Sequence, residues 1–152
     1  FVREAMALHG GMTVDDLCVA DLPYAPPYSP AIDPLITAAH VLQNKMDGLM
    51  ASISSMDFKK KLDEGENMWL LDVRTPEECG EMCLGLGEEL IPIQVIRKSL
   101  DKLPQDKSTP IIVFCKISLR GHEASRFLIG QGYSNVMVLE GGLTAWPYEK
   151  KI

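Results

Sequence analysis

The most informative segment of the chain reads Ile111-Ile112-Val113-Phe114-Cys115-Lys116-Ile117-Ser118-Leu119-Arg120-Gly121. Its first four residues are apolar, which predicts a short strand buried on both faces of a sheet. Residues 121–130 carry a helical pattern, so a cysteine and a short loop connect the strand to a helix. In open parallel sheets, functional groups gather at the carboxyl ends of the strands, where the chain enters the helices. Cys115 is therefore the first candidate for chemistry.

Segments before and after this one alternate short apolar runs with helical patterns. Strands are expected at residues 68–73, 90–93, 111–114 and 136–139. Helices are expected at residues 57–64, 76–82, 96–103 and 121–130. This alternation predicts an α/β domain with a mostly parallel sheet and right-handed crossovers.

The first 50 residues have a different composition, and we expect them to form a mostly helical, proline-rich segment. Helices are predicted at residues 1–9 and 34–50, the second with Asp33 as its N-cap and Pro34 in its first turn. Residues 23–30 hold four of the ten prolines and two tyrosines, which favours an extended, polyproline-like strap.

Residues 48–55 mix small and polar side chains, which favours a linker. We therefore divide the chain into an N-terminal segment at residues 1–50, with the linker reaching about residue 55, and a compact domain at residues 56–152. With 152 residues in total, the chain has room for one catalytic domain, but not for separate cofactor and substrate domains.

The overall composition narrows the classes of partner. The chain carries 15 Lys and Arg against 21 Asp and Glu, a formal net charge of −6, which disfavours nucleic acid and anionic membrane surfaces. Its longest apolar run, residues 111–115, is far shorter than a membrane span. The 4 cysteines are irregularly spaced and no signal-like segment begins the chain, so we expect free thiols in the cytoplasm. Proteins or small molecules are the expected partners.

Several features around Cys115 favour a thiolate. The free N–H groups and the positive dipole end of the following helix, together with Lys116 and Arg120, stabilise a negative charge on a nearby sulfur. The loop is also short enough for its amides to converge on one sulfur atom or small anion. We therefore prefer a reactive cysteine to the plainer interpretation of a buried core cysteine. Arg120 is expected to close the loop, whereas Lys116 fits a solvated lysine and a donor-binding charge equally well.

The spacing of cysteine and arginine separates two chemistries. Arg120 closes a loop of six residues, counting Cys115, whereas a phosphatase-type loop has its arginine one position later, where this chain has Gly121. The smaller ring favours a sulfur atom over a phosphate. Phosphatase or arsenate-reductase chemistry on the same cysteine is the less favoured alternative.

For other polar side chains near this segment, a structural role is preferred to a catalytic one. Asp72 and Arg74 end a predicted strand, where a buried ion pair or a hydrogen bond to the loop is preferred to direct chemistry. Cys79 and Cys83 stand four residues apart on a predicted helical turn, which leaves open a resolving role toward Cys115.

The three histidines are scattered at positions 9, 40 and 122, in a spacing that predicts no metal site. His122 follows the loop directly. An exposed histidine in the first helical turn is the preferred interpretation, and tuning of the loop is the alternative.

Together these features resemble the rhodanese (thiosulfate sulfurtransferase) family, whose active loop is a cysteine, four residues and an arginine at this place in a parallel sheet. The resemblance covers residues 55–148, and its further motifs are Leu71-Asp72-Val73-Arg74, Pro76-Glu77-Glu78, Ile91-Pro92, Leu103-Pro104 and Glu140-Gly141-Gly142-Leu143 with Trp146. It implies a rhodanese-like parallel sheet flanked by helices, with Cys115 as the catalytic residue and Asp72 and Arg74 in support. The implied substrate-binding loop consists of Lys116, Ile117, Ser118, Leu119, Arg120 and Gly121. Residues 79–87 depart from the family, which usually carries a Gly-His-Ile-Pro-Gly-Ala-like stretch there.

Residues 1–50 resemble the C-terminal dimerisation segment of pyridine-nucleotide disulfide reductases, in the coenzyme A-disulfide reductase branch. The matching stretches are residues 13–17, 21–29 and 33–34. In that branch a rhodanese domain is often fused at the C-terminus, as in NADH-dependent persulfide reductases. The resemblance implies a longer parent protein in which FAD, NAD(P)H and coenzyme A belong to other domains. It also implies that Tyr24 or Tyr28 faces the reductase site of a partner subunit. No Gly-x-Gly-x-x-Gly motif follows a predicted strand, so we expect this chain by itself to bind neither FAD nor NAD.

The expected activity is transfer of sulfur from thiosulfate, a polysulfide or a low-molecular-weight persulfide, through a persulfide on Cys115, to a thiol acceptor. The expected protein partner is a second copy of the chain or the reductase domain of the parent. A dimerisation or docking module with little turnover is the main alternative, because the predicted helix at residues 34–50 has an apolar face.

Overall fold

The computed structural model describes residues 2–23, 26–28 and 30–151. The chain divides into two compact units, Phe1–Leu49 and Met50–Ile152, and each is described by itself.

The first unit contains three helices, α1 (Val2–His9), α2 (Val14–Cys18) and α3 (Pro34–Met46). Asp33 is the N-cap of α3, as predicted, because its carboxylate accepts a hydrogen bond from the N–H of Leu35. The helix ends at Met46 and not at residue 50, since Gly48 takes a positive φ of 68°, which does not continue an α-helix.

The proline-rich strap differs from its prediction. Pro26, Pro27 and Tyr28 form a turn and not an extended segment. The φ of about −65° that proline imposes suits a turn as well as an extended strand, so the residue type alone does not separate them. Tyr28 is 90% exposed, and Tyr24 lies outside the described residues.

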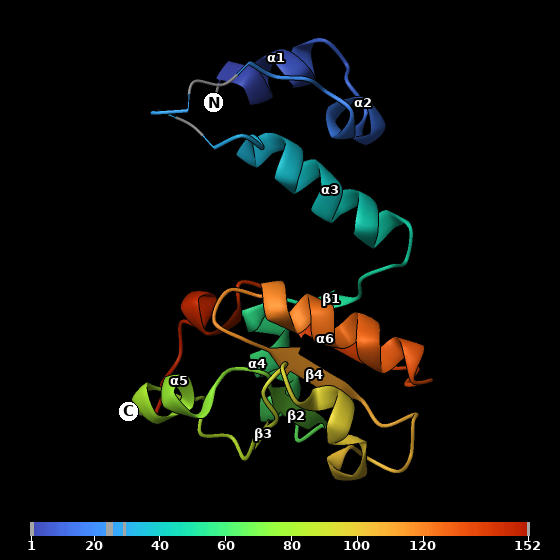
Figure 1. Cartoon of the computed structure of the whole chain (residues 1–152), viewed down its shortest axis with the longest axis vertical. Helices are drawn as coiled ribbons and strands as arrows, with labels where there is room; N and C mark the ends of the chain where they lie inside the picture. The colour runs from blue at the N-terminus through green and yellow to red at the C-terminus, as the bar shows by residue number, and fades with distance from the viewer. Residues whose placement is uncertain (1, 24–25, 29, 152) are drawn as a thin grey trace. The chain divides into compact units, whose positions relative to one another are not determined.

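The second unit is built on a five-stranded sheet with the order β1-β5-β4-β2-β3, in which every neighbouring pair is parallel. Figure 1 shows helix α6 beside strand β4 of this sheet. The strands are β1 (Ser52–Ile53), β2 (Trp69–Asp72), β3 (Glu89–Leu90), β4 (Ile111–Phe114) and β5 (Val136–Leu139). The predicted α/β fold with a parallel sheet is therefore confirmed.

The edge strand β1 corrects the expected linker at residues 48–55. Ser52 and Ile53 pair with Val138 and Leu139 of β5, and Ile53 is buried. A two-residue strand is too short to show a periodic pattern, so sequence reasoning assigned it to the linker.

The connections run through α4 (Ser55–Asp63), α5 (Pro76–Glu81), α6 (Leu119–Gly130) and three 3-10 turns, η1 (Ile96–Lys98), η2 (Leu100–Lys102) and η3 (Gly142–Ala145). The helix expected at residues 96–103 is wrong, because η1 and η2 are separate turns that meet at Ser99. Ser99 has φ −119° and ψ 31°, which a continuous α-helix does not allow.

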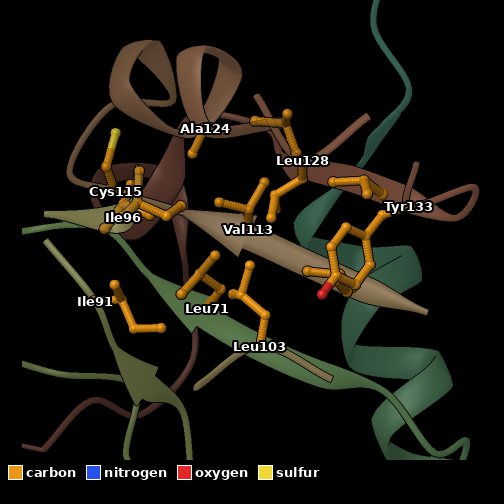
Figure 2. Packing of buried hydrophobic residues seen from close by; sticks show 13 residues of the cluster. Leu71, Ile91, Ile96, Leu103, Val113, Cys115, Ala124, Leu128 and Tyr133 are labelled. Carbon is orange, nitrogen blue, oxygen red and sulfur yellow. The ribbon is translucent and has the colours of Figure 1, made fainter. Parts of the chain in front are cut away.

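Both faces of the sheet are buried, which explains the continuous apolar runs. In β4, Ile111 and Val113 face one hydrophobic cluster while Ile112 and Phe114 face the other. Figure 2 shows the first cluster, in which Val113 packs between Leu71 of β2 and the side chains of α6.

Strand register places the candidate site at one edge of the sheet. Asp72, the last residue of β2, is the partner of Phe114, the last residue of β4. The segments that follow β2 and β4 therefore leave the sheet side by side, the first toward Arg74 and the second toward Cys115.

Candidate active site

Cys115 follows β4 and is buried, with 1% of its surface exposed. Figure 2 shows it at one end of the hydrophobic cluster, with its sulfur directed away from Leu71. The backbone that follows it is anchored to η3, because the carbonyl of Cys115 accepts a hydrogen bond from Leu143 N at 3.0 Å and that of Lys116 accepts one from Thr144 N at 3.0 Å. The start of the loop is therefore held against a segment from the far end of the domain.

The close approach of η3 requires glycine at position 142. Gly142 has a positive φ of 54°, and a Cβ built on it would lie 2.2 Å from the carbonyl oxygen of Cys115. No other residue type fits without moving one of the two segments.

The loop presents backbone donors that remain open. For the N–H groups of residues 116–121, no hydrogen-bond acceptor lies within the described part of the chain. In a trans peptide the N–H points opposite to the C=O, so the carbonyls bound to η3 turn the N–H groups of Lys116 and Ile117 away from it. Such a row of unpaired amides at a helix N-terminus attracts an anion or an electron-rich sulfur.

Ser118 holds the loop in a strained conformation. It is the N-cap of α6 and has a φ of 79°, the only positive φ of a non-glycine residue among the described residues. Its hydroxyl donates to the carbonyl of Leu139 at 2.8 Å and makes no cap to the helix. The side chain thus ties the loop to the end of β5 and leaves the first N–H groups of α6 unoccupied.

Arg120 forms an ion pair with Glu78, a residue that sequence analysis did not place in the site. Both terminal nitrogens of Arg120 donate to the two carboxylate oxygens of Glu78, each at 2.7 Å. Hydrogen bonds from Arg120 lower the pKa of Glu78 to about 2, against the opposing effect of burial. The ion pair with Glu78 likewise raises the pKa of Arg120, against the opposing effect of burial. Arg120 therefore connects the active loop to α5.

One local signal could have identified Glu78. Thr75 and Glu78 form a capping box at the start of α5, in which each side chain bonds the backbone N–H of the other. The Thr-x-x-Glu spacing is visible in the sequence and predicts where Glu78 lies on its helix. Its contact with Arg120 depends on how α5 packs beside α6.

Asp72 and Arg74 form a buried ion pair next to the one between Arg120 and Glu78. Their exposed fractions are 0% and 3%, and Arg74 Nη2 lies 2.6 Å from Asp72 Oδ2. Burial acts to lower the pKa of Arg74, but the hydrogen bonds and charge of Asp72 outweigh it, so the net shift is upward. Arg74 also donates from Nη1 to the carbonyl of Glu78 at 3.0 Å, which extends the network from β2 to α5.

A cavity of about 300 Å³ opens beside the loop. It is lined by Arg74, Glu78, Glu81, Met82, Lys116, Leu143, Thr144 and Lys150. Because Lys116 is among the lining residues, the cavity extends to the residue next to Cys115. The other predicted loop residues, Ile117 and Leu119, are 61% and 74% exposed, whereas Gly121 is buried against β4 and β5.

Cys79 is poorly suited to nucleophilic chemistry. Cys79 lies on α5, but the helix ends at Glu81, so Cys83 does not share its helical turn as expected. Burial raises the pKa of the Cys79 thiol, and the charge of Asp72 adds to the shift. A thiol with a raised pKa carries little thiolate at neutral pH.

His122 is not the exposed histidine that the sequence suggested. It is partly buried, and its Nδ1 is buried with no hydrogen-bond partner among the described residues. Burial lowers its pKa, and the charge of Arg126 acts in the same direction, so the ring is held neutral.

Residues 2–23, 26–28 and 30–151 contain neither a metal-binding cluster nor a membrane-spanning helix. No group of three His, Cys, Asp or Glu side chains is placed to bind a metal ion. No helix there has the length and apolar character needed to cross a membrane.

Comparison with known proteins identifies the fold family. Residues 54–149 match the model of the rhodanese-like domain. The chain belongs to the rhodanese family. A protein named sulfurtransferase from Allochromatium vinosum is 29% identical to the rhodanese domain over 98 residues, which cover 64% of this chain and 89% of that protein.

Two solved structures match nearly the whole chain. The reduced CoADR-RHD of Bacillus anthracis superposes with a TM-score of 0.83 at 32% identity, over 93% of this chain and 24% of that one. A NAD-dependent persulfide reductase from A. fulgidus gives a TM-score of 0.76 at 42% identity, over 94% of this chain and 24% of that one. These matches confirm the resemblance to a rhodanese module of the fusion type. The chain spans about a quarter of the length of both proteins.

Proposed function

We propose that the rhodanese domain is a sulfurtransferase that carries sulfur as a persulfide on Cys115. The observation that carries the proposal is the row of N–H groups at residues 116–121, which directly follow Cys115 and have no hydrogen-bond acceptor among the described residues. These donors have no protein partner to give up, so an anionic sulfur that accepts from them would need little reorganisation of the loop.

The reaction has two steps. The Cys115 thiolate attacks the outer sulfur of a donor such as thiosulfate, a polysulfide or a low-molecular-weight persulfide. A bond forms between Cys115 Sγ and that sulfur, while the bond within the donor breaks and its electron pair leaves with the rest of the donor, as sulfite in the case of thiosulfate. In the second step a thiol acceptor removes the sulfur and the thiolate returns.

Each residue of the site has a proposed part in this cycle. The loop from Lys116 to Gly121 binds the transferred sulfur through its backbone. Arg120 is held by Glu78, so its proposed role is to position the loop. The proposed role of Asp72 and Arg74 is to support α5, through the hydrogen bond from Arg74 to the carbonyl of Glu78.

Intact mass measurement after incubation with thiosulfate tests the proposal. We expect a gain equal to one sulfur atom in the wild-type chain and in the Cys79→Ser and Cys83→Ser variants, and no gain in Cys115→Ser. A wild-type chain that gains no sulfur, or a Cys115→Ser variant that still does, would sink the proposal. Hydrolysis of an aryl phosphate by the same preparation would instead favour the phosphatase alternative.

A docking or dimerisation role is a second candidate for the first unit. Val2, Leu8 and Val19 are at least 77% exposed, which leaves apolar side chains of residues 2–19 without cover inside their own unit. We propose a second copy of the chain or a reductase domain of a longer parent as the partner, with Tyr24 or Tyr28 reaching the partner's site. Sedimentation at low protein concentration tests the homodimer, and a strict monomer would count against it.

Cofactors and location complete the proposal. We propose that FAD, NAD(P)H and coenzyme A act only in such a longer parent and that this chain binds none of them. All four cysteines are free thiols, which supports a reducing, cytoplasmic setting.

A further inference from the structure

The thiol of Cys115 is nearly closed off from solvent, because only 1% of the surface of this residue is exposed. The cavity of about 300 Å³ borders the active loop. Lys116 lies on its wall together with Leu143 and Thr144, whose N–H groups bond the carbonyls of Cys115 and Lys116. This volume is at the small end of the range for small-molecule sites. A segment that narrows the cavity therefore controls which molecules approach the loop.

Residues 147–151 provide one part of the cavity wall. They follow the buried Trp146 and have no regular secondary structure up to Lys151. Lys150 is half-buried and lines the cavity, whereas Tyr148 and Glu149 before it are exposed. Figure 1 shows the C-terminal segment, drawn in red, running toward α5. The segment thus crosses from η3, which binds the active loop, to the chain that follows α5.

The far end of this segment is fastened by one antiparallel bridge. Lys151 and Cys83 exchange two backbone hydrogen bonds of 2.8 and 2.9 Å. The side chain of Lys151 lies over Gly85, where a built Cβ would be 2.5 Å from its Cδ. A bridge of one residue pair is a small cooperative unit, and such units open locally without unfolding of the domain.

The turn that receives the bridge is held more firmly than the segment that docks on it. The carboxylate of Glu88 accepts hydrogen bonds from the N–H groups of Gly85 at 2.9 Å and Leu86 at 2.8 Å. This turn belongs to residues 79–87, the stretch that departs from the rhodanese pattern, with Glu88 directly after it. Breaking the bridge should therefore move residues 147–151 and leave the turn in place.

We infer that residues 147–151 are a gate that limits the size of the molecules reaching Cys115. With the bridge to Cys83 formed, the cavity admits molecules of the size of thiosulfate. With the bridge broken, larger molecules reach the loop. The inference rests on the proposed function for its consequence, which is that small sulfur donors are preferred to bulky ones.

The test measures access to the Cys115 thiol with two uncharged reagents that share one reactive group. N-methylmaleimide is small and N-(1-pyrenyl)maleimide is bulky. Labelling of Cys115 is followed by the mass of the peptide that contains it, which separates it from the other three cysteines. The measured quantity is the ratio of the bulky to the small reagent's labelling rate, because changes in thiol reactivity affect both rates alike.

Lys151→Pro removes the N–H that donates to Cys83, and Lys151→Ala is the matched control that keeps both backbone bonds of the bridge. We expect the ratio to rise about fivefold or more in Lys151→Pro, since the loss of one hydrogen bond favours the open gate by about this factor. A chain that ends at Tyr148 lacks the bridge altogether and should show a larger rise. The alanine variant should keep the wild-type ratio.

An unchanged ratio in both Lys151→Pro and the shortened chain would overturn the inference, and so would an equal rise in Lys151→Ala. A variant in which both reagents label Cys115 as fast as they label free cysteine is unfolded, and the other variant then decides. Incubation of the wild-type chain with thiosulfate is recorded separately. Failure to gain sulfur would overturn the sulfurtransferase proposal, while the labelling ratios still decide whether the gate exists.

Discussion

Arg120 and Glu78 stand 42 residues apart in the sequence and meet through two parallel hydrogen bonds of 2.7 Å. Arg120 belongs to the first turn of α6, and Glu78 to α5, so this one contact joins the active loop to the helix that follows β2. A guanidinium bound at both nitrogens has a fixed direction, unlike a single-point contact. The position of the loop therefore depends on the carboxylate of α5.

Replacing Glu78 by Gln should loosen the loop. The variant keeps the size of the side chain but loses the charge and one acceptor oxygen. We expect the free energy of unfolding in urea to fall by about 1–3 kcal/mol, and sulfur loading of Cys115 to slow. Glu81→Gln removes a carboxylate from the same helix that has no ion-pair partner among the described residues, and it serves as control. Equal urea midpoints for the two variants would contradict this role of Glu78.

The ion pair of Arg120 with Glu78 should make the free energy of unfolding depend on pH in the acidic range. The pKa of Glu78 is about 2 in the folded chain, and the ordinary value for Glu is about 4.3. A group with a lowered pKa stabilises the fold above its unfolded pKa, and this stabilisation is lost as the pH falls through the folded pKa. The stability difference between wild type and Glu78→Gln should therefore shrink from about pH 5 to about pH 2. A constant difference over this range, measured by denaturant unfolding, would argue against the shift.

Alanine at position 142 should displace the active loop. The added Cβ would collide with the carbonyl oxygen of Cys115, and the φ of 54° adds backbone strain. We expect a loss of about 3 kcal/mol or more in unfolding free energy, with impaired loading of Cys115. Gly65→Ala is the matched control, because its φ of 73° is equally unfavourable but its Cβ would meet nothing within 4 Å. That variant should lose only about 1 kcal/mol, and similar losses in both would show that the contact with Cys115 carries no cost.

Two substitutions of Ser118 should separate strain from hydrogen bonding. Ser118→Ala keeps the unfavourable φ and loses the bond to Leu139, so we expect destabilisation of about 1 kcal/mol. Ser118→Gly loses the same bond but relieves the left-handed strain, and should be more stable than the alanine variant by about 1 kcal/mol. Thermal unfolding of the two variants measures the difference, and an alanine variant at least as stable as the glycine variant would exclude strain at this position.

The buried pair of Asp72 and Arg74 should behave as one unit. Arg74→Met leaves the Asp72 carboxylate buried without its cation and should cost about 3–5 kcal/mol. Adding Asp72→Asn removes that charge, so the double variant should lose clearly less than the sum of the two single variants. A double-mutant cycle in urea measures this coupling, and additive losses would show that the two residues do not depend on each other.

The local sequence was sufficient wherever neighbours along the chain determine the structure. The apolar runs predicted β4 and β5 at their observed bounds, and Asp33 predicted the start of α3. The place of Cys115, between a buried strand and a helix, followed from the same patterns. Periodicity and capping are properties of short segments, so they can be read without knowing how the segments pack.

Tertiary structure alone decided the contacts that complete the site. The ion pair of Arg120 with Glu78, the closeness of Gly142 to Cys115 and the place of Lys150 at the cavity join segments that are distant in the chain. Likewise, the two residues of β1 are identified as a strand only through their pairing with β5. Such contacts depend on the order of strands and on helix packing, because a side chain's own neighbours do not specify which distant group it meets. The sequence by itself thus determined where the cysteine lies, and the folded domain determined what surrounds it.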